Sequence, residues 1–229
     1  MIRLNTIYWL EVYDAIRGLM GYSMTSDYES CRIAEEYYFK ALLEGRGLRI
    51  IDVCRVLRDP VCVVGGSADL EYHVSKLYKC RSVIAANGSS TLLLSYGVVP
   101  DVIVTDLDGS WDTLIKCSKL GSILVVHAHG DNIHAIKSLL PHLDNIVITC
   151  QTPPPIGYAT ILGGFTDGDR AIVLSLYCGY KPKLYGMNFR GLVGWWSKPW
   201  LKESTSPWPE KRAKLRIGEI IASLLSRLW

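Results

Sequence analysis

The chain has 229 residues, of which 49% are hydrophobic and 21% charged, and its formal net charge is +3. This composition predicts a globular protein with enough apolar residues for one sizeable α/β domain. The small charge gives no argument for a nucleic-acid partner, and no apolar run approaches the roughly 18 residues of a membrane span. Because Glu11 and Asp14 interrupt the N-terminal apolar stretch, we expect no signal peptide and a cytoplasmic protein.

Residues 1–58 are predicted to form an N-terminal helical segment. Apolar and aromatic residues recur at helical spacing near its start, a second helix is expected at about 30–43, and a short amphipathic piece covers 48–57. Aromatic residues at this spacing are typical of a packed core. We therefore expect no chemistry from this segment.

Residues 59–190 are predicted to form the catalytic α/β domain. Helices are expected near 68–79, 110–119, 132–140 and 168–178, and a further helix after Asn87-Gly88. Short strands that alternate with helices predict a mainly parallel sheet covered by helices on both faces. The predicted strands are 61–64, 83–86, 102–105, 123–126, 146–149 and 183–185.

Residues 191–229 are predicted to be a basic and aromatic C-terminal segment that ends in a helix. The part from Lys198 to Arg216 carries six basic residues and two acidic ones, and such runs are usually solvated surfaces. Four tryptophans beside it indicate a lid or a surface that packs on a partner. The helix after Pro209 is expected to bury one face, made of Ile217, Ile220, Ile221, Leu224 and Leu225.

The seven cysteines include no Cys-x-x-Cys pair. Their odd number and irregular spacing predict neither a disulfide framework nor a zinc site. Most lie among apolar neighbours, where a free cysteine behaves as a small hydrophobic residue. The single glutamine and five asparagines are few, as in heat-adapted proteins, although the number of cysteines opposes that interpretation. The cysteines are Cys31, Cys54, Cys62, Cys80, Cys117, Cys150 and Cys178.

Two predicted strands are followed by polar clusters. Asp106 and Asp108 come after 102–105, and His129 and Asp131 come after 123–126. Ligands of open α/β sheets bind at the carboxyl ends of the strands, so we expect both clusters to face one pocket. Carboxylates gathered in this way suit Mg²⁺ bound together with substrate phosphates. A single aspartate after a strand is more often a turn or cap residue, but the repetition favours a metal site.

Two glycine turns are candidates for phosphate binding. Gly65-Gly66-Ser67 follows the first predicted strand, and Asn87-Gly88 follows the second. Glycines let backbone N–H groups approach a phosphate, and a helix N-terminus favours its negative charge. A tight turn with Ser67 as a helix cap explains the first pattern equally well.

The run from Gly163 to Ala171 is predicted to be a turn that opens a helix at Thr166 and Asp167. The helix carries Arg170 in its first turn, where a positive charge opposes the helix dipole. An anionic partner explains this position better, and the planar guanidinium suits phosphate.

Three motifs follow one another along the chain: Val104-Thr105-Asp106-Leu107-Asp108-Gly109, His127-Ala128-His129-Gly130-Asp131-Asn132, and Gly163-Gly164-Phe165-Thr166-Asp167-Gly168-Asp169-Arg170-Ala171. Together they resemble the archaeal 6-hydroxymethyl-7,8-dihydropterin pyrophosphokinase family, whose core fold is similar to that of thiamine pyrophosphokinase. The likeness covers most of the chain, through Gly186-Met187 and the basic segment 211–214. It departs at two turns, where this chain has Ser67-Ala68-Asp69 and Ala86-Asn87-Gly88-Ser89.

The resemblance implies that the β,γ-diphosphate of ATP is transferred to the hydroxymethyl oxygen of a reduced pterin, leaving AMP. It implies ATP and the pterin as partners and neither nucleic acid nor membrane; a homo-oligomer is left open. Mg²⁺ would be held by Asp106, Asp108 and Asp131, and His129 would orient or deprotonate the hydroxymethyl group. The residues expected to neutralise or bind the phosphates are Gly65, Gly66, Ser67, Asn87, Gly88, Thr166, Asp167, Arg170, Lys211 and Lys214. The candidates for the polar edge of the pterin are Gln151, Thr152 and Asn188.

Three other functions are weighed. Thiamine is an alternative acceptor for the same reaction. Asp106-Leu107-Asp108 is also the Asp-x-Asp arrangement by which many glycosyltransferases hold a metal-bound nucleotide sugar. A catalytically silent nucleotide-binding module is disfavoured, because a binding protein has no need for three carboxylates around a metal.

Overall fold

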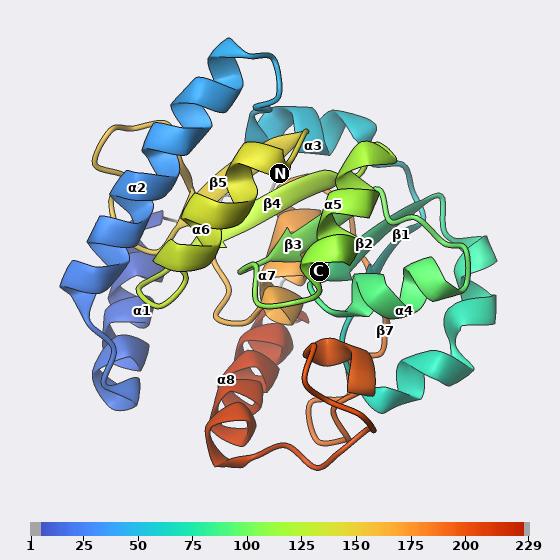
Figure 1. Cartoon of the computed structure of the whole chain (residues 1–229). Coiled ribbons are helices and arrows are strands. Elements are labelled where there is room, and N and C mark those ends of the chain that lie inside the picture. Colours follow the sequence, from blue (N-terminus) through green and yellow to red (C-terminus); the bar gives the residue numbers. More distant parts are fainter. Residues whose placement is uncertain (1–5, 227–229) are drawn as a thin grey trace.

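The computed structural model describes residues 6–226 and contains one seven-stranded sheet with helices on both faces (Figure 1). Every paired strand is parallel to its neighbour, and the spatial order is β6-β5-β4-β3-β2-β1-β7. The predicted α/β class is confirmed. The strands are β1 (Val61–Val64), β2 (Ser82–Ala86), β3 (Val102–Thr105), β4 (Ile123–Ala128), β5 (Ile146–Cys150), β6 (Thr160–Ile161) and β7 (Lys183–Tyr185).

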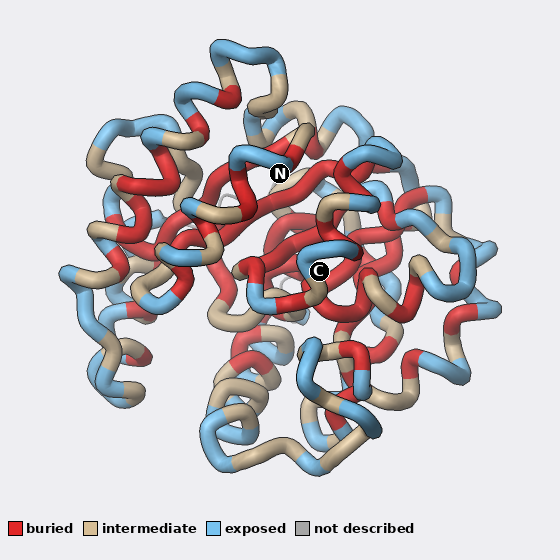
Figure 2. The backbone as a smooth tube through the Cα atoms, viewed as in Figure 1, coloured by how far each residue is buried: buried red, intermediate tan, exposed pale blue. Residues whose placement is uncertain are grey.

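Alternate residues of each central strand enter two separate cores. In β1, Cys62 and Val64 face one core, whereas Val61 and Val63 face the other. Strands buried on both faces read as continuous apolar runs, and Figure 2 shows the sheet as the buried centre of the molecule. One face is covered by α2 (Met24–Leu43), α4 (Ser89–Ser95), α5 (Trp111–Lys119) and α6 (Ile133–Leu139). The other is covered by α1 (Thr6–Met20), α3 (Ile50–Val56), α7 (Asp167–Tyr177) and α8 (Pro209–Ser226).

Because the strands are all parallel, their carboxyl ends lie at one edge of the sheet. From β1 to β5 each new strand is added next to the previous one, and the chain then returns through α7 to place β7 beside β1. Because all strands are parallel, the residues that follow them meet at the same edge. That edge carries the predicted polar clusters.

The elements differ from the predictions mainly at their ends. The stretch predicted as a helix at 68–79 forms two 3₁₀ helices, η1 (Ala68–Tyr72) and η2 (Val74–Lys79). α2 begins at Met24 rather than near residue 30, because the Ser23 side chain caps it by accepting from the Ser26 backbone N–H. β6 was not predicted, since two half-buried residues leave no periodic pattern. The division of the chain at 58 and 190 stays a prediction.

The predicted buried face of the last helix is wrong in part. Ile221 and Leu225 are buried against α7, but Ile220 and Leu224 are 60% and 56% exposed. Residues four apart lie on one stripe of a helix, and α8 contacts the domain only along such a stripe. The apolar residues beside the stripe therefore stay in solvent.

The prediction that the cysteines form no disulfides is also wrong. Three disulfides are present, Cys31–Cys150, Cys54–Cys178 and Cys62–Cys80, and Cys117 is the free buried cysteine. In two of these disulfides the cysteines are separated by 119 and by 124 residues along the chain. Such pairings depend on how the helices pack on the sheet, so sequence spacing does not predict them. Some heat-adapted proteins are rich in disulfides, so the number of cysteines does not oppose the interpretation that the few amides favour.

Within residues 6–226, every helix is too short or too polar to cross a lipid bilayer.

Candidate active site

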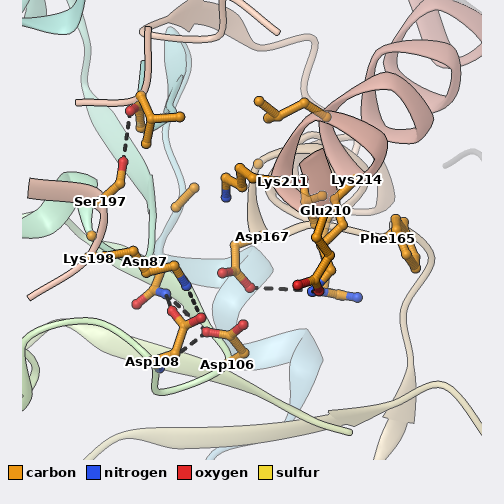
Figure 3. Close-up of a pocket in the computed structure, with 18 of the residues that line it drawn as sticks. Asn87, Asp106, Asp108, Phe165, Asp167, Ser197, Lys198, Glu210, Lys211 and Lys214 are labelled. Carbon is orange, nitrogen blue, oxygen red and sulfur yellow. Dashed lines mark hydrogen bonds and ion pairs between the residues drawn. The ribbon is translucent and has the colours of Figure 1, made fainter. Parts of the chain in front are cut away.

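A cavity of about 640 Å³ opens at the carboxyl edge of the sheet (Figure 3). Its wall combines the segments that follow β1, β2, β3, β4, β5 and β7 with the N-terminal turn of α7, the start of α8, and parts of α1 and α2. This volume lies within the range of about 300–1,000 Å³ that is usual for small-molecule sites.

Asp106 and Asp108 follow β3 and are held side by side by Asn87, which follows β2. Asn87 Nδ2 donates to Asp106 Oδ1 at 3.0 Å and also to Asp108 Oδ1. Between the two aspartates Leu107 has a φ of 68° and a side chain only 1% exposed, so the turn sends Leu107 into the core and both carboxylates toward the cavity. The Thr105 hydroxyl donates to Asn87 Oδ1 at 2.9 Å and fixes the amide. The sequence predicts Asn87 at the phosphates, and the structure shows that it also positions Asp106 and Asp108, which we call the acid pair.

His129 lies between two carboxylates. Its Nε2 is 3.6 Å from Asp106 Oδ2, and its Nδ1 contacts Asp131 Oδ1. Burial opposes the charge of His129, but the bonds to Asp106 and Asp131 outweigh it and raise the pKa of His129 to about 9. Burial would likewise raise the pKa of Asp106, yet His129 holds that pKa well below its usual range. His129 is therefore a cation at neutral pH.

Asp131 stands apart from the other two predicted metal ligands. Its side chain is 78% exposed and is bound to His129, which separates it from Asp106. Within residues 6–226, no group of three or more histidine, cysteine, aspartate or glutamate side chains is arranged to hold a metal ion. The structure brings Asp106 and Asp108 together, and Asp131 can join them only by leaving His129.

Arg170 is buried at the start of α7, with a side chain 2% exposed. Its Nη2 donates to the Gly164 carbonyl at 2.8 Å, and its Nη1 is 3.6 Å from Asp167 Oδ1. Burial, followed by repulsion from Asp106, raises the pKa of Asp167 to about 8. Arg170 therefore has a neighbour within the chain, both side chains line the cavity, and its predicted contact with phosphate stays a prediction.

Thr166 is the N-cap residue of α7, and this role alone accounts for a threonine at the position. The Asp169 carboxylate accepts from the backbone N–H groups of Phe165 and Thr166 at 2.6 and 2.8 Å, and from the Thr166 hydroxyl. This reciprocal arrangement is a capping box. Thr166 still lines the cavity, so its predicted contact with phosphate stays a prediction.

The glycine turns are packed closely against the chain. A Cβ on Gly65 would lie 2.5 Å from the Gly186 carbonyl oxygen, and one on Gly66 would lie 2.5 Å from Ser197 Oγ. A Cβ on Gly88 would lie 2.7 Å from Ser197 Cα. These glycines line the cavity, but close backbone packing already requires them there.

Ser67 and Asn188 join the turn after β1 to the turn after β7. The Asn188 backbone N–H donates to Ser67 Oγ at 3.0 Å, and Asn188 Oδ1 accepts from the Arg190 backbone N–H at 3.1 Å. Both residues line the cavity. Their side-chain oxygens are engaged in holding these turns, which limits what they offer a ligand.

Gln151 and His127 form a buried polar end of the cavity. Gln151 is 7% and His127 1% exposed, and both line the wall. Burial lowers the pKa of His127 well below its ordinary value, so the ring is neutral. Within residues 6–226, neither His127 Nε2 nor Gln151 Oε1 makes a well-formed hydrogen bond. Thr152 is also buried, with an unpaired hydroxyl, but it is not part of the wall.

Lysines from the C-terminal segment form the opposite wall. Lys211 and Lys214 of α8 line the cavity as predicted, whereas Arg212 points outward and its Nη2 donates to the Pro207 carbonyl. Lys198 also reaches the cavity and contacts Asp108. Burial lowers the pKa of Lys198 to about 8. The sequence placed Lys198 in a basic run, but nothing in that run distinguished it from its neighbours.

The N-terminal helices contribute to the wall, contrary to expectation. Asp27 of α2 accepts from the Tyr13 hydroxyl at 2.5 Å and from the Gly130 backbone N–H at 2.8 Å. The Ser30 hydroxyl donates to Asn132 Oδ1, and Asn132 Nδ2 donates to the carbonyl groups of His127 and Asp106. These bonds fix the loop after β4. Helical periodicity marks only a core face, so it gave no sign of this role.

The fold and the cavity define the class: a parallel α/β enzyme with carboxylates and lysines gathered at the carboxyl edge of its sheet. Residues 41–191 match the family described as 6-hydroxymethylpterin diphosphokinase MptE-like. The chain belongs to this family and is a diphosphotransferase.

Relatives named 6-hydroxymethyl-7,8-dihydropterin pyrophosphokinase match nearly the whole chain. The protein of Pyrococcus furiosus is 39% identical over 213 residues, which cover 92% of this chain and 89% of the relative. That of Methanothermobacter thermautotrophicus is 36% identical over 224 residues, covering 96% and 94%. That of Methanocaldococcus jannaschii is 33% identical over 221 residues, covering 90% and 89%. The predicted resemblance is therefore confirmed.

Proposed function

We propose that the protein transfers the β,γ-diphosphate of ATP to the hydroxymethyl oxygen of 6-hydroxymethyl-7,8-dihydropterin and releases AMP, with Mg²⁺ as cofactor. The observation that carries the proposal is the division of charge across the cavity. Asp106 and Asp108 lie on one side, and Lys211 and Lys214 extend from α8 on the other (Figure 3). Phosphoryl transfer depends chiefly on positioning and on neutralising charge, which such an arrangement provides.

The acid pair fits Mg²⁺. Mg²⁺ is usually bound by one or two carboxylates together with substrate phosphates and water. Asp106 and Asp108 are two carboxylates fixed side by side by Asn87, with Asp108 42% exposed to the cavity. When bound there, the metal would neutralise charge on the phosphates. Asp131 serves in this proposal as the partner of His129.

Arg170 and the turns contribute to phosphate binding. Arg170 is buried and donates to the Gly164 carbonyl, so we assign it to fixing the N-terminal turn of α7, with Thr166, beside the phosphates. In the two glycine turns, the backbone N–H groups of Gly65, Ser67 and Asn87 already donate to backbone carbonyl groups, so those of Gly66 and Gly88, which line the cavity, are assigned the polyphosphate.

Asp167 rather than His129 is the better acceptor for the hydroxymethyl proton. His129 has the higher pKa, about 9, so a smaller fraction of it is free to take a proton at neutral pH, and it holds Asp106 in place. Asp167 has a pKa of about 8, and its Oδ1 makes no hydrogen bond within residues 6–226. A base with a pKa near the working pH is best suited to proton transfer. Figure 3 shows Asp167 between the acid pair and Phe165.

The pterin is assigned to the end of the cavity away from Asp108. His127 and Gln151 interact with each other there, but His127 Nε2 and Gln151 Oε1 make no well-formed hydrogen bond within residues 6–226, and a pterin ring has N–H and carbonyl groups to pair with them. Phe165 and Tyr22 add stacked aromatic rings, with centroids 6.3 Å apart. Thr152 supports this end from behind the wall, whereas Asn188 follows β7 and lies with the Ser67 turn, away from Gln151.

An assay of AMP release tests the proposal. The protein is incubated with ATP and Mg²⁺ and with one acceptor at a time: the reduced hydroxymethylpterin, thiamine, or none. We expect AMP and pterin diphosphate in equal amounts with the pterin alone. Equal or faster AMP release with thiamine would move the function to thiamine pyrophosphokinase. Turnover of a nucleotide sugar in place of ATP would move it to glycosyl transfer.

A further inference from the structure

Lys198 lies beside the acid pair, although 90 positions separate it from Asp108 in the sequence. Its ammonium group forms an ion pair with Asp108 Oδ2. The Lys198 side chain is 17% exposed, whereas that of Asp108 is 42% exposed. Figure 3 shows Lys198 next to Asn87 and Asp108, across the cavity from Lys211.

The segment that carries Lys198 is anchored on the glycine turns. We call residues 193–198 the strap. The Gly194 backbone N–H donates to the Gly66 carbonyl at 2.9 Å, and the Ser197 hydroxyl donates to the same oxygen at 2.8 Å. Gly88 lies so close beneath Ser197 that a side chain there would collide with it. The strap is thus fixed to the wall of the cavity by these contacts, and this fixes the position of Lys198.

A purely structural role gives little reason for this placement. Removing an ammonium group from water is costly, and a pair with a half-exposed carboxylate returns about 0–1 kcal/mol. Asp108 has access to solvent and is already bonded to Asn87, so it needs no buried counter-ion. The position of Lys198 is better explained by a ligand that both charges share.

Lys198 and Lys211 reach the same cavity from different elements. Both also favour the charged form of Asp106. Lys198 comes from the strap and Lys211 from α8. Two cations in one cavity with a pair of carboxylates suit a polyphosphate chain bound together with a metal ion.

We propose that Lys198 is a further catalytic residue, which binds the polyphosphate of the nucleotide on the Asp108 side of the cavity. The inference rests on the proposed function and assigns to its reaction a residue that the sequence left in a solvated basic run. In the free protein the ammonium group rests on Asp108; with nucleotide bound it contacts the phosphate oxygens.

In the reaction the hydroxymethyl oxygen forms a bond to the β-phosphorus, and the bond from that phosphorus to the oxygen shared with the α-phosphate breaks. AMP leaves with the electron pair, and the hydroxyl proton passes to the base. Lys198 keeps its proton throughout. Its charge stabilises the phosphate oxygens as negative charge shifts onto the leaving AMP.

The test compares K198M with K202M, a matched change at an exposed lysine of the same segment. Binding is measured by calorimetry with the Mg²⁺ complex of an ATP analogue that has a methylene group between the α- and β-phosphorus. Mg²⁺ binding alone, the melting temperature, kcat and KM are measured in parallel. We expect K198M to weaken analogue binding and to lower kcat, each by about tenfold or more, and K202M to change both less than about twofold.

K198R and K198Q complete the series. Arginine keeps the charge and should keep most of the analogue affinity, whereas glutamine should lose as much as methionine does. If K198M does not fold, the comparison of K198R with K198Q decides. Unchanged analogue affinity together with tighter Mg²⁺ binding in K198M or K198Q would overturn the proposal, because Lys198 would then be a counter-ion that competes with the metal.

The two proposals fail separately. A wild-type protein that releases no AMP with any acceptor, yet binds the analogue in a way that depends on Lys198, would refute the proposed reaction and leave nucleotide binding by Lys198 standing. Normal AMP release by K198M would refute the role of Lys198 and leave the reaction standing.

Discussion

The two walls of the cavity are built in different ways. The acidic wall comes from the ends of β3 and β4, and its aspartates and His129 are held by hydrogen bonds from Asn87, Asn132 and each other. The basic wall comes from residues 191–214 and rests on the sheet through the strap and α8. A disulfide ties α2 to β5 beside the acidic wall, whereas the chain beyond residue 178 contains no cysteine. The comparison indicates a rigid wall for the metal and a more adaptable wall for the phosphates.

The largest effect is expected at the acidic wall. Asp108→Asn removes a proposed metal ligand that is partly exposed, so turnover should fall about a hundredfold or more while the melting temperature changes little. Steady-state kinetics across a range of Mg²⁺ concentrations measure this. Asp112→Asn, at an exposed position in the first turn of α5, is the matched control and should keep normal turnover. Near-normal turnover in Asp108→Asn would remove the acid pair from the metal site.

The next largest effect is expected on stability, from removing the Cys31–Cys150 disulfide beside the acidic wall. Cys31→Ala/Cys150→Ala opens a loop closed over 119 positions, and a loop of about 100 residues contributes about 4–5 kcal/mol in the chain-entropy model. We expect the melting temperature to fall by on the order of 10 °C. Cys117→Ala, at the free buried cysteine, controls for loss of a buried sulfur. If both variants melt together, the disulfide does not stiffen this side of the molecule.

His129 makes the stability of the acidic wall depend on pH. Its pKa is raised from 6.5 to about 9 in the folded protein, so its contribution to the free energy of unfolding is complete below pH 6.5 and is lost as pH rises through 9. We expect the excess melting temperature of the wild type over His129→Gln to shrink by on the order of 5 °C across that interval, in the absence of Mg²⁺. A constant difference would mean that His129 is not held as a cation.

The smallest effect is expected in the mobility of the basic wall. If residues 198–216 close over the triphosphate as a lid, their amide hydrogens should exchange more slowly once Mg²⁺ and the ATP analogue are bound. The segment 102–132, in the acidic wall, should change less because its hydrogen bonds are already complete. Hydrogen exchange read by mass spectrometry compares the two segments directly. If the amide hydrogens of 198–216 exchange equally fast with and without Mg²⁺ and the analogue, this segment is a solvated basic surface and not a lid.

The sequence predicted the parts of the site that lie next to strands. Asp106, Asp108 and His129 were found because an apolar β-branched run followed by polar residues is a local signal, and parallel topology then places such residues at one edge. Arg170 is unusual in the first turn of a helix, and the sequence indicates this, but it does not indicate that Asp167 lies beside it. The local sequence shows that a positive charge stands at an unfavourable position in the helix, but it does not show which side chain lies next to that charge.

The six main strands, their mainly parallel arrangement and the acidic residues at their ends were determined by the sequence itself, because hydrophobic period and turn chemistry act over a few residues. Only the tertiary structure decided which distant residues meet: Lys198 on Asp108, Asp27 on Gly130, and Cys31 on Cys150. The reason is that each of these contacts joins segments brought together by packing on the sheet. Contacts of that kind depend on the order of strands and the faces of helices, which spacing along the chain does not encode.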